Sequence, residues 1–527
     1  MKSSSSSPHF STPLLVLLLL LPLLLHTTES LSPIKTVVIL VLENRSFDHM
    51  LGYLKQSLNP SIDGLTGAEC NPLSASSSSI CVSDDAGFVE SDPGHSFQAV
   101  VQQVFGSSAI PSMSGFAQQA STVSSSLPLT VMQCFDPQTL PVFSTLVDEF
   151  AVFDRWYRFN HEKLLGSECA PSAQVLVIFY DFNIFLCFIR NGFSSIPGPT
   201  QPNRLFLYSA TSHGATTHDP LELFTGYPQK TIFDSLHENL HDFAVYFSTL
   251  PTTLFYARMR KLEYASKFHW FSAFGAHAKA GKLAKLSVIE PRYFDLLGAE
   301  ANDDHPAHDV GNGQRLVKEV YEMLRASPQW NESLLIVSYD EHGGFYDHVE
   351  TPYVGVPNPD GMRGPAPFFF DFDRLGVRVP TIMVSPWIKK GTVVSRPNGP
   401  TANSEYEHSS IPATLKKIFG LKSDFLTKRD AWAGTFEHIF EELSSPRTDC
   451  PEILPSPFPT RSSTEIKEDS FLSEFQAELV DLASVLNGDS IFNLHRDTDK
   501  KMAVKEADAY VKSAIKNYLK ASKEAIH

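Results

Sequence analysis

Two apolar stretches decide the fold: IKTVVILVLEN (Ile34 to Asn44) and SLLIVSYDE (Ser333 to Glu341). Near-continuous runs of β-branched residues and leucine are typical of strands buried on both faces of a parallel sheet. VRVPTIMVSPW (Val377 to Trp387) has the same pattern and predicts a third such strand, whereas GQRLVKEVYEMLRAS (Gly313 to Ser327) has the apolar spacing of an amphipathic helix. Strands alternating with helices predict an α/β fold, a three-layer sandwich with a mostly parallel central sheet.

The C-terminal part of the chain has a different pattern from about Ser456 onward. Two segments place apolar residues on one helical face, Phe471, Phe475, Leu479, Leu482 and Leu486 in the first and Val504, Val511, Ile515 and Leu519 in the second. We therefore expect a main domain over residues 31–455 and a helical C-terminal region over 456–527, docked on the main domain or on another surface.

The first thirty residues predict the compartment. PLLVLLLLLPLLL (Pro13 to Leu25) follows Lys2 and a serine run, and Thr28 and Ser30 give the small-x-small pattern of a cleavage site. About a dozen apolar residues are too few for a membrane-spanning helix, which needs about 20. We interpret residues 1–30 as a cleaved signal peptide and the mature protein as secreted or lumenal; an uncleaved anchor is the alternative.

Composition and cysteines agree with a large folded protein of that compartment. The 527 residues are 42% hydrophobic, and the formal charge of −16 argues against a nucleic-acid partner. Six cysteines are too few for a disulfide scaffold, but Cys70 and Cys81 are close enough to close a small loop. Asn331 and Asn44 both lie in N-glycosylation sequons, although Asn44 has a competing role.

Polar side chains follow two of the predicted strands at the point where each ends. Glu43 and Asn44 follow the first, and Asp340 and Glu341 follow the second. Ligands of open α/β sheets bind at the carboxyl ends of strands, and carboxylate and amide oxygens suit a hard divalent cation. Either dipeptide alone would more often cap a turn, but two after buried strands predict a metal site of unknown metal identity.

A hydroxyl nucleophile is available at Thr200, in PGPTQPNR. Prolines at 199 and 202 restrict the backbone on both sides, and a metal or base would activate the hydroxyl. The same spacing also occurs in ordinary ordered loops.

A series of long, ordered motifs resembles the plant non-specific phospholipases C. They are ENRSFDHMLGYL, DPGHSFQA, GFAQQ, FDRWY, TQPNR, SATSHG, PQKTIFDSL, NDDHP, YDEHGGFYDHV, GVPNPDG, FDRLGVRVP, SPWI and EHSSIPATLKKIFGL. The resemblance runs from about Ile34 into the C-terminal region and implies an alkaline-phosphatase-like core. It also implies hydrolysis of glycerophospholipids such as phosphatidylcholine and phosphatidylethanolamine to diacylglycerol and a phosphorylated head group.

The resemblance assigns roles to individual residues. Glu43, Asn44, Asp340 and Glu341 match the metal- or phosphate-site positions, and Thr200 matches the proposed nucleophile, which implies a phosphothreonine intermediate. Three histidines lie in matching motifs, His95, His305 and His408; a structural hydrogen bond is the commoner role for any one of them. We select His95 and His305 as candidates for protonating the leaving alkoxide or binding phosphate oxygens.

One segment departs from the family pattern. Arg158 to Phe193 adds about 36 residues between FDRWY and SSIPGPTQPNR, including the apolar run AQVLVIFYDFNIFLCFI. We interpret it as a retained intron because the family pattern resumes in frame. The alternatives are an apolar lip at the site or a slightly short transmembrane helix. If the segment is real, Thr200 is displaced and the protein becomes a catalytically inactive lipid-binding form.

A phospholipase must also contact a membrane surface, and two basic segments are candidates for peripheral contact. Phe255 to Lys285 carries seven Lys or Arg among aromatic residues, and a second group of lysines lies between Lys500 and Lys523. Either could instead be a solvated helix face. The rival activity is an acid phosphatase acting on soluble monoesters. Head-group preference, protein partners and oligomeric state do not follow from the sequence.

Overall fold

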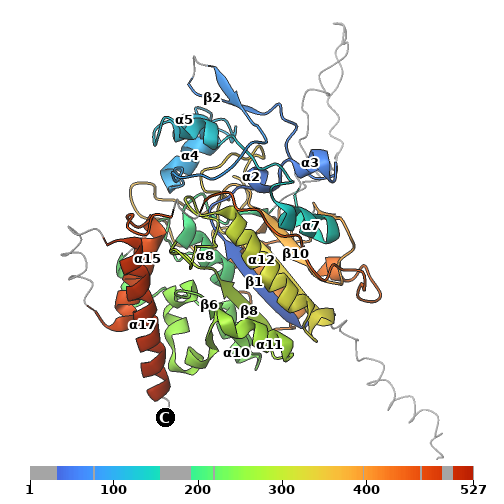
Figure 1. Cartoon of the computed structure of the whole chain (residues 1–527), viewed down its shortest axis with the longest axis vertical. Coiled ribbons are helices and arrows are strands. Elements are labelled where there is room, and N and C mark those ends of the chain that lie inside the picture. Colours follow the sequence, from blue (N-terminus) through green and yellow to red (C-terminus); the bar gives the residue numbers. More distant parts are fainter. Residues whose placement is uncertain are drawn as a thin grey trace, which may run out of the picture.

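The computed structural model describes residues 32–74, 78–154, 192–217, 220–395, 397–462, 466–489 and 502–525. An eight-stranded sheet lies at the centre of the fold (Figure 1). In spatial order its strands are β11 (Thr392–Val394), β4 (Ala151–Phe153), β10 (Thr381–Val384), β9 (Ser333–Tyr339), β1 (Thr36–Leu42), β8 (Leu286–Glu290), β6 (Phe243–Phe247) and β7 (Phe268–Trp270).

The sheet is parallel apart from β10. That strand runs antiparallel to both of its neighbours, β9 and β4, while the other pairs are parallel. The prediction of a parallel strand over Val377–Trp387 was therefore wrong in direction and in length. Pro380 and Pro386 flank the short strand, and a proline has no N–H to donate to a sheet.

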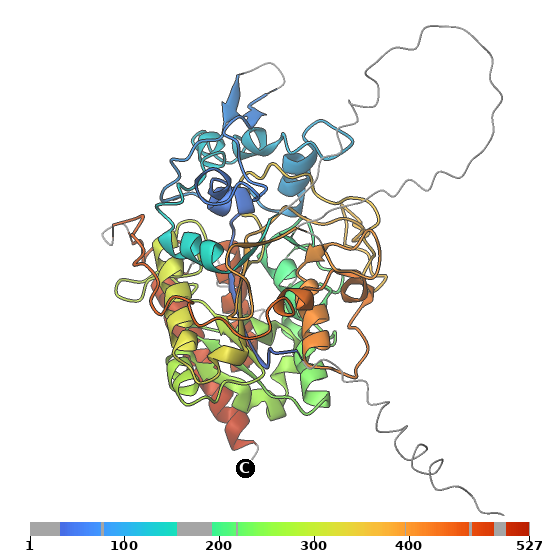
Figure 2. The ribbon, with the colours of Figure 1, turned by 90° about the vertical axis from the view of Figure 1, so that its right-hand side faces the viewer.

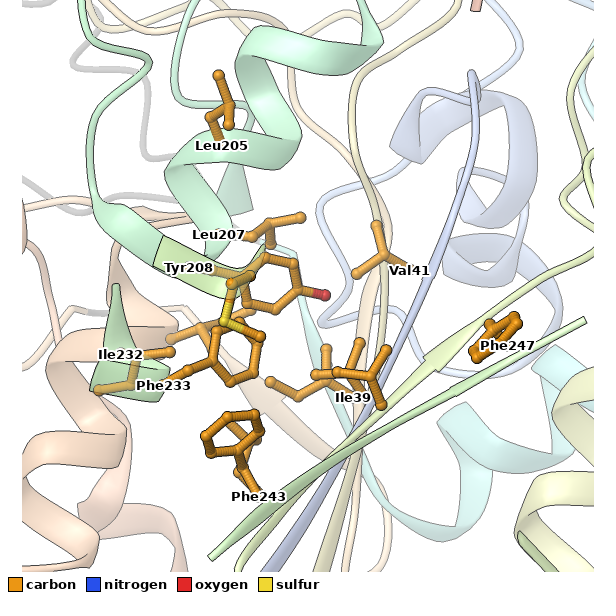
Figure 3. Packing of buried hydrophobic residues seen from close by; sticks show 14 of the residues in the cluster. Ile39, Val41, Leu205, Leu207, Tyr208, Ile232, Phe233, Phe243 and Phe247 are labelled. Carbon is orange, nitrogen blue, oxygen red and sulfur yellow. The ribbon is translucent and has the colours of Figure 1, made fainter. Parts of the chain in front are cut away.

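The sheet has a hydrophobic core on each face, as the three-layer prediction requires. Alternate residues of β1 point to opposite faces: Ile39 lies in one core and Leu40 in the other. Figure 3 shows the first core, in which Phe233 and Phe243 pack near Ile39. This core also receives α8 (Thr200–Ser209), α10 (Ile232–Glu238) and α13 (Ser410–Ile418), whereas α7 (Pro141–Glu149), α11 (Phe274–Lys279) and α12 (Val310–Arg325) cover the other face. The mostly parallel α/β sandwich is confirmed.

The predicted helices are present. The helix predicted over Gly313–Ser327 is α12, and the two C-terminal patterns form α15 (Glu474–Asn487) and α17 (Val504–Glu524). Both C-terminal helices pack on the first core, so this region docks on the main domain (Figure 1, red). The prediction that Phe471 lies on the apolar face of the first helix was wrong, because Phe471 precedes α15 and 64% of its surface is exposed.

Shorter elements cover the carboxyl end of β1 (Figure 2, blue). They include the hairpin of β2 (Cys70–Pro72) and β3 (Ser79–Cys81), which a Cys70–Cys81 disulfide joins. The small loop anticipated between these cysteines is thus closed. The remaining short helices and strands are α2 (Phe47–Leu51), α3 (Leu54–Ser57), α4 (Phe97–Phe105), α5 (Phe116–Ala120), α6 (Leu127–Thr130), α9 (Pro220–Thr225), α14 (Lys428–Trp432), β5 (Gly192–Phe193) and β12 (Tyr406–Glu407).

Most of the atypical segment, Arg158–Phe193, lies outside the described residues, and so do residues 1–31. The last two residues of the segment form β5, whose Phe193 is fully buried. A Cβ built on Gly192 would lie 3.7 Å from the Cβ of Phe153, so the chain returns next to the point where its description stops. Among the helices the structure describes, none combines the length and apolarity that crossing a membrane requires.

Candidate active site

The predicted acidic and amide residues meet at the carboxyl edge of the sheet. Leu42 pairs in register with Tyr339, so β1 and β9 end side by side, and the backbone N–H of Asn44 donates to Oδ1 of Asp340 over 3.1 Å. Asn44 has a φ of +56°, which turns the chain immediately after the strand. The backbone at position 343 passes so close to the backbone of Asn44 that only glycine fits, because a Cβ on Gly343 would lie 2.1 Å from the carbonyl oxygen of Asn44.

Thr200 lies in the same place although it is distant in sequence. It is the first residue of α8, and its hydroxyl donates to Oδ1 of Asn44 over 3.2 Å. The side-chain amide of Asn203 fixes the loop before the helix by donating to the carbonyl oxygens of Ile196, Gly198 and Pro199. Thr200 therefore lies at the positive end of the helix dipole, where an anion is stabilised.

Arg204 is the central residue that sequence reasoning missed. Its Nε donates to Oδ2 of Asp340 over 3.0 Å, and its Nη2 donates to Oε1 of Glu43 over 3.2 Å. All three side chains are almost completely buried. A signal was present, because Arg204 lies one helical turn after Thr200 within TQPNR and therefore on the same helix face.

The site holds more acid than Arg204 can neutralise. Burial raises the pKa of Glu43 well above its usual value, against the attraction of Arg204, and burial raises the pKa of Asp340 to about 7. Glu290 adds a further carboxylate 3.9 Å from Arg204. Although burial disfavours its charge, Arg204 has a pKa raised above its usual value by Tyr293 and these carboxylates.

Several buried polar atoms around Thr200 have no hydrogen-bond partner among the described residues. They are Nδ2 of Asn44, Oε1 of Glu341 and both amide atoms of Gln201. The other oxygen of Glu341, Oε2, accepts from the backbone N–H of Gly343 over 2.8 Å. Buried polar groups normally have partners, so these atoms indicate a place for a bound ligand.

The predicted metal set fits a divalent cation by this chemistry. Glu43, Asn44, Asp340 and Glu341 supply hard oxygen ligands, more buried carboxyl groups than Arg204 can pair with and an unpartnered carboxyl oxygen. Arg204 already neutralises part of the charge of Glu43 and Asp340, a contact that the prediction did not include.

A second acidic and histidine group also has metal-ligand spacing. One ligand atom each from Asp48, Asp347 and His348 lies within 4.8 Å of the others. However, Arg378 contacts Asp48 over 2.7 Å and Asp347 over 3.0 Å, and the pKa of His348, lowered by burial but raised more by Asp48, is about 10. Two cations therefore already balance these carboxylates, and the group stabilises the loop that follows β1.

The candidate histidines fall into two places. His305 is buried and His95 is partly buried, and both share Asp92, each with a ring nitrogen 3.6 Å from one of its carboxylate oxygens. His408 lies apart from them, with Nε2 3.1 Å from the carbonyl oxygen of Tyr339 and a pKa lowered to about 4 by burial. The selected pair is thus brought together, and His408 supports the end of β9.

The two selected histidines have opposite charge states. Burial lowers the pKa of each, but Asp92 and Glu341 raise that of His95 to about 9. Burial dominates for His305, whose pKa is about 4. At neutral pH, His95 therefore carries a proton that it can donate, whereas His305 is neutral.

The C-terminal region contributes to the site, and no pattern in the sequence predicted this. Phe475 of α15 lies against Arg204, with the guanidinium carbon 5.6 Å from the ring centroid. The neighbouring Gln476 donates to the carbonyl oxygen of Tyr293 over 2.7 Å, and Tyr293 in turn donates to Glu290 over 2.5 Å. The first turn of α15 thus packs behind the charged cluster.

A mostly parallel α/β sheet with a helix-borne hydroxyl and buried acids at its carboxyl edge suits a hydrolase of the phosphoester class. A model of the Phosphoesterase family matches residues 34–162 and 178–422, leaving out 163–177 within the atypical segment. The relatives from Arabidopsis thaliana include Non-specific phospholipase C6, 60% identical over 94% of this chain and 89% of the relative. Non-specific phospholipase C1 is 52% identical over 94% and 87%, and Non-specific phospholipase C3 is 49% identical over 94% and 91%.

The chain therefore belongs to the non-specific phospholipase C group of the Phosphoesterase family. Membership makes it a phosphoric diester hydrolase.

Proposed function

We propose that this protein hydrolyses glycerophospholipids such as phosphatidylcholine and phosphatidylethanolamine on the glycerol side of the phosphate, with Thr200 as nucleophile. The products are diacylglycerol and the phosphorylated head group. The observation that carries the proposal is the hydrogen bond from the Thr200 hydroxyl to Asn44, at a helix N-terminus surrounded by buried acids.

The reaction takes two displacements at phosphorus. Oγ1 of Thr200 attacks the phosphorus as its proton passes to a carboxylate of the acidic cluster. The bond to the glycerol oxygen breaks, and that oxygen takes a proton from His95, so that diacylglycerol leaves. The phosphate is then esterified to both Thr200 and the head group. Water attacks the phosphorus and gives a proton to His95, and the threonine oxygen leaves with the proton that the carboxylate had taken, which releases the phosphorylated head group. The positive end of α8, the amide of Asn44 and Arg204 stabilise the negative charge on the phosphoryl oxygens.

Glu43, Asn44, Asp340 and Glu341 are the residues that would hold a divalent cation. Such an ion would polarise the phosphoryl oxygens and lower the proton affinity of a hydroxyl. The buried acid left over after pairing with Arg204 supports its presence.

The protein enters the secretory pathway through residues 1–30 and meets its substrate at a membrane surface. The Cys70–Cys81 disulfide supports an oxidising compartment. Asn331 is exposed and open to a glycan, whereas Asn44 is completely buried and unsuited to one.

A product assay tests this function. The protein is given phosphatidylcholine in mixed micelles or a nitrophenyl phosphate monoester, each with and without a chelator. We expect diacylglycerol and phosphocholine from the micelles and loss of both after metal removal. Preferential hydrolysis of the monoester would instead identify an acid phosphatase, and no turnover of either would identify an inactive lipid-binding form.

A further inference from the structure

The two basic segments that the sequence presents separately form one surface. The helix α17 packs on η4 (Leu262–Lys267), and the hydroxyl of Tyr518 donates to the carbonyl oxygen of Arg260 over 3.0 Å. Between α17 and β7 lies a hollow of about 590 Å³, which we call the lysine hollow. Its lining comprises Phe268, His269, Trp270, Ser272, Ala273, Lys516, Leu519, Lys520, Lys523 and Glu524.

The lysine hollow is cationic in a chain whose formal charge is −16. Lys516, Lys520 and Lys523 are exposed, and spacings of four and three residues place them on one face of α17. Glu524 is the acid in the lining, 3.9 Å from Lys520. His269 adds no charge at neutral pH, because burial, followed by His277 and Lys523, lowers its pKa.

Trp270 forms an aromatic wall beside these lysines. The Trp270 ring packs on Phe247 with a centroid separation of 4.6 Å. Nζ of Lys516 lies 5.9 Å from the centroid of the Trp270 ring. The side chain is partly exposed, which is the arrangement that favours tryptophan at a membrane–water interface.

A second hollow, which shares Trp270 and Ser272 with the lysine hollow, provides a contrast. Its volume is about 710 Å³, and its lining includes two basic residues, Arg292 and Arg315. Acids balance both arginines there: Glu300 lies 3.8 Å from Arg315, and the charge of Arg292 acts on Glu319. Of these two hollows, the lysine hollow is therefore the one with an excess of positive charge.

We propose that the lysine hollow is a docking surface for the anionic phosphate head groups of a bilayer, separate from the site that carries Thr200. The match of three exposed lysines and an interfacial tryptophan to an anionic surface carries this inference. The role of this docking surface in catalysis rests on the proposed function, because a protein docked on a membrane meets its lipid substrate in that same membrane.

The surface also lies beside the edge of the sheet that bears the site. Trp270 pairs in register with Phe247, which pairs with Glu290 next to Arg204. Three strand spacings separate β7 from β1, about 15 Å in all.

Sedimentation with vesicles tests the docking surface. The full chain carrying Lys516→Gln, Lys520→Gln and Lys523→Gln is compared with wild type on vesicles of phosphatidylcholine alone and of an equimolar mixture with phosphatidylserine. The matched control, Lys389→Gln with Lys422→Gln and Lys428→Gln, removes the same charge from exposed lysines outside the hollow.

We expect the hollow variant to bind the mixed vesicles roughly 100-fold more weakly, since each of the three lysines near an anionic surface contributes about fivefold in affinity. The control should bind as wild type does, and glycerol 3-phosphate at the same phosphate concentration should not displace the protein. Equal binding by the two variants, or displacement by the soluble phosphate, would overturn the proposal.

Hydrolysis of a monomeric short-chain phosphatidylcholine separates this proposal from the proposed function. Both variants should turn it over at the wild-type rate, because none of the substituted lysines belongs to the site that carries Thr200. If wild type itself fails on this substrate, the proposed function fails while the vesicle result still decides the docking surface.

Discussion

Arg204 is the residue on which the charge balance of the site depends. It donates to both Glu43 and Asp340, and only 4% of its surface is exposed, so little solvent is available to replace it. Removing one partner of a buried ion pair leaves an uncompensated charge, which costs about 3–5 kcal/mol. We expect Arg204→Ala to lower the free energy of unfolding by that amount in urea denaturation.

Arg204→Lys is the matched variant for this prediction. Lysine retains the charge but cannot donate to two carboxylates as a planar fork, so we expect a smaller loss of stability and a large loss of kcat. Wild-type stability in Arg204→Ala would contradict the charge balance described here.

His95 gives the site a pH dependence. Its folded-state pKa of about 9 lies above the usual value of about 6.5, so the ring is protonated at neutral pH and loses its proton as the pH rises through 9. We expect kcat/KM to fall above that pH. The charged ring also stabilises the fold: this contribution is complete below about pH 6.5 and is lost as the pH rises through 9.

His305 supplies the control for the alkaline limb. With a pKa of about 4 it is already neutral throughout this range, so His305→Gln should keep the alkaline fall, whereas His95→Gln should remove it together with most of the activity. A pH–rate profile of each variant decides the matter. An unchanged alkaline limb in His95→Gln would show that another group supplies the proton.

At the scale of elements, the first turn of α15 connects the C-terminal region to the site. Phe475 is 4% exposed and packs on Arg204 and Tyr293, while Phe471, four residues earlier, is 64% exposed. Replacing a buried phenylalanine by alanine costs about 3–5 kcal/mol. We expect Phe475→Ala to lose stability of that order in thermal or urea unfolding and to lower kcat as well.

Phe471→Ala is the matched control, because the same side chain is removed from an exposed position. Its stability should change by no more than about 0.5 kcal/mol. Similar losses in both variants would mean that α15 does not pack against the charged cluster.

At the scale of the whole molecule, we predict that the fold does not depend on the atypical segment. Phe153 and Gly192 lie side by side. In a chain lacking residues 158–193, Trp156 and Tyr157 would take the positions of Gly192 and Phe193. Arg155 alone would then connect Asp154 to them, which is within the reach of one residue. We expect this shortened protein to fold and to hydrolyse phosphatidylcholine at least as fast as the full chain. Aggregation or loss of turnover would contradict the retained-intron interpretation, and so would finding the segment in every spliced transcript.

The sequence predicted the parts of this molecule that depend on local pattern. The runs at Ile34–Asn44 and Ser333–Glu341 are recognisable because strands buried on both faces must be apolar throughout. The acids that follow them meet because parallel neighbours end at one edge. Strand direction at β10 was not accessible, because an antiparallel strand buried in the same sheet has the same composition.

Contacts between distant segments could not be predicted from pattern. The role of Arg204 depends on two carboxylates from separate strands, and the position of Phe475 depends on how α15 docks. The lysine hollow likewise forms only when α17 packs beside β7. Such contacts follow from the tertiary arrangement, which a helical or strand period does not encode.

The most direct test of the account is the reaction of Thr200 variants with phosphatidylcholine labelled in the choline head group. Acid-quenched wild type should carry label on the peptide that contains Thr200. Thr200→Ser should retain a fraction of turnover, and Thr200→Ala should lose both the label and diacylglycerol release while unfolding at the wild-type temperature. Diacylglycerol release by Thr200→Ala at the wild-type rate would contradict a threonine nucleophile.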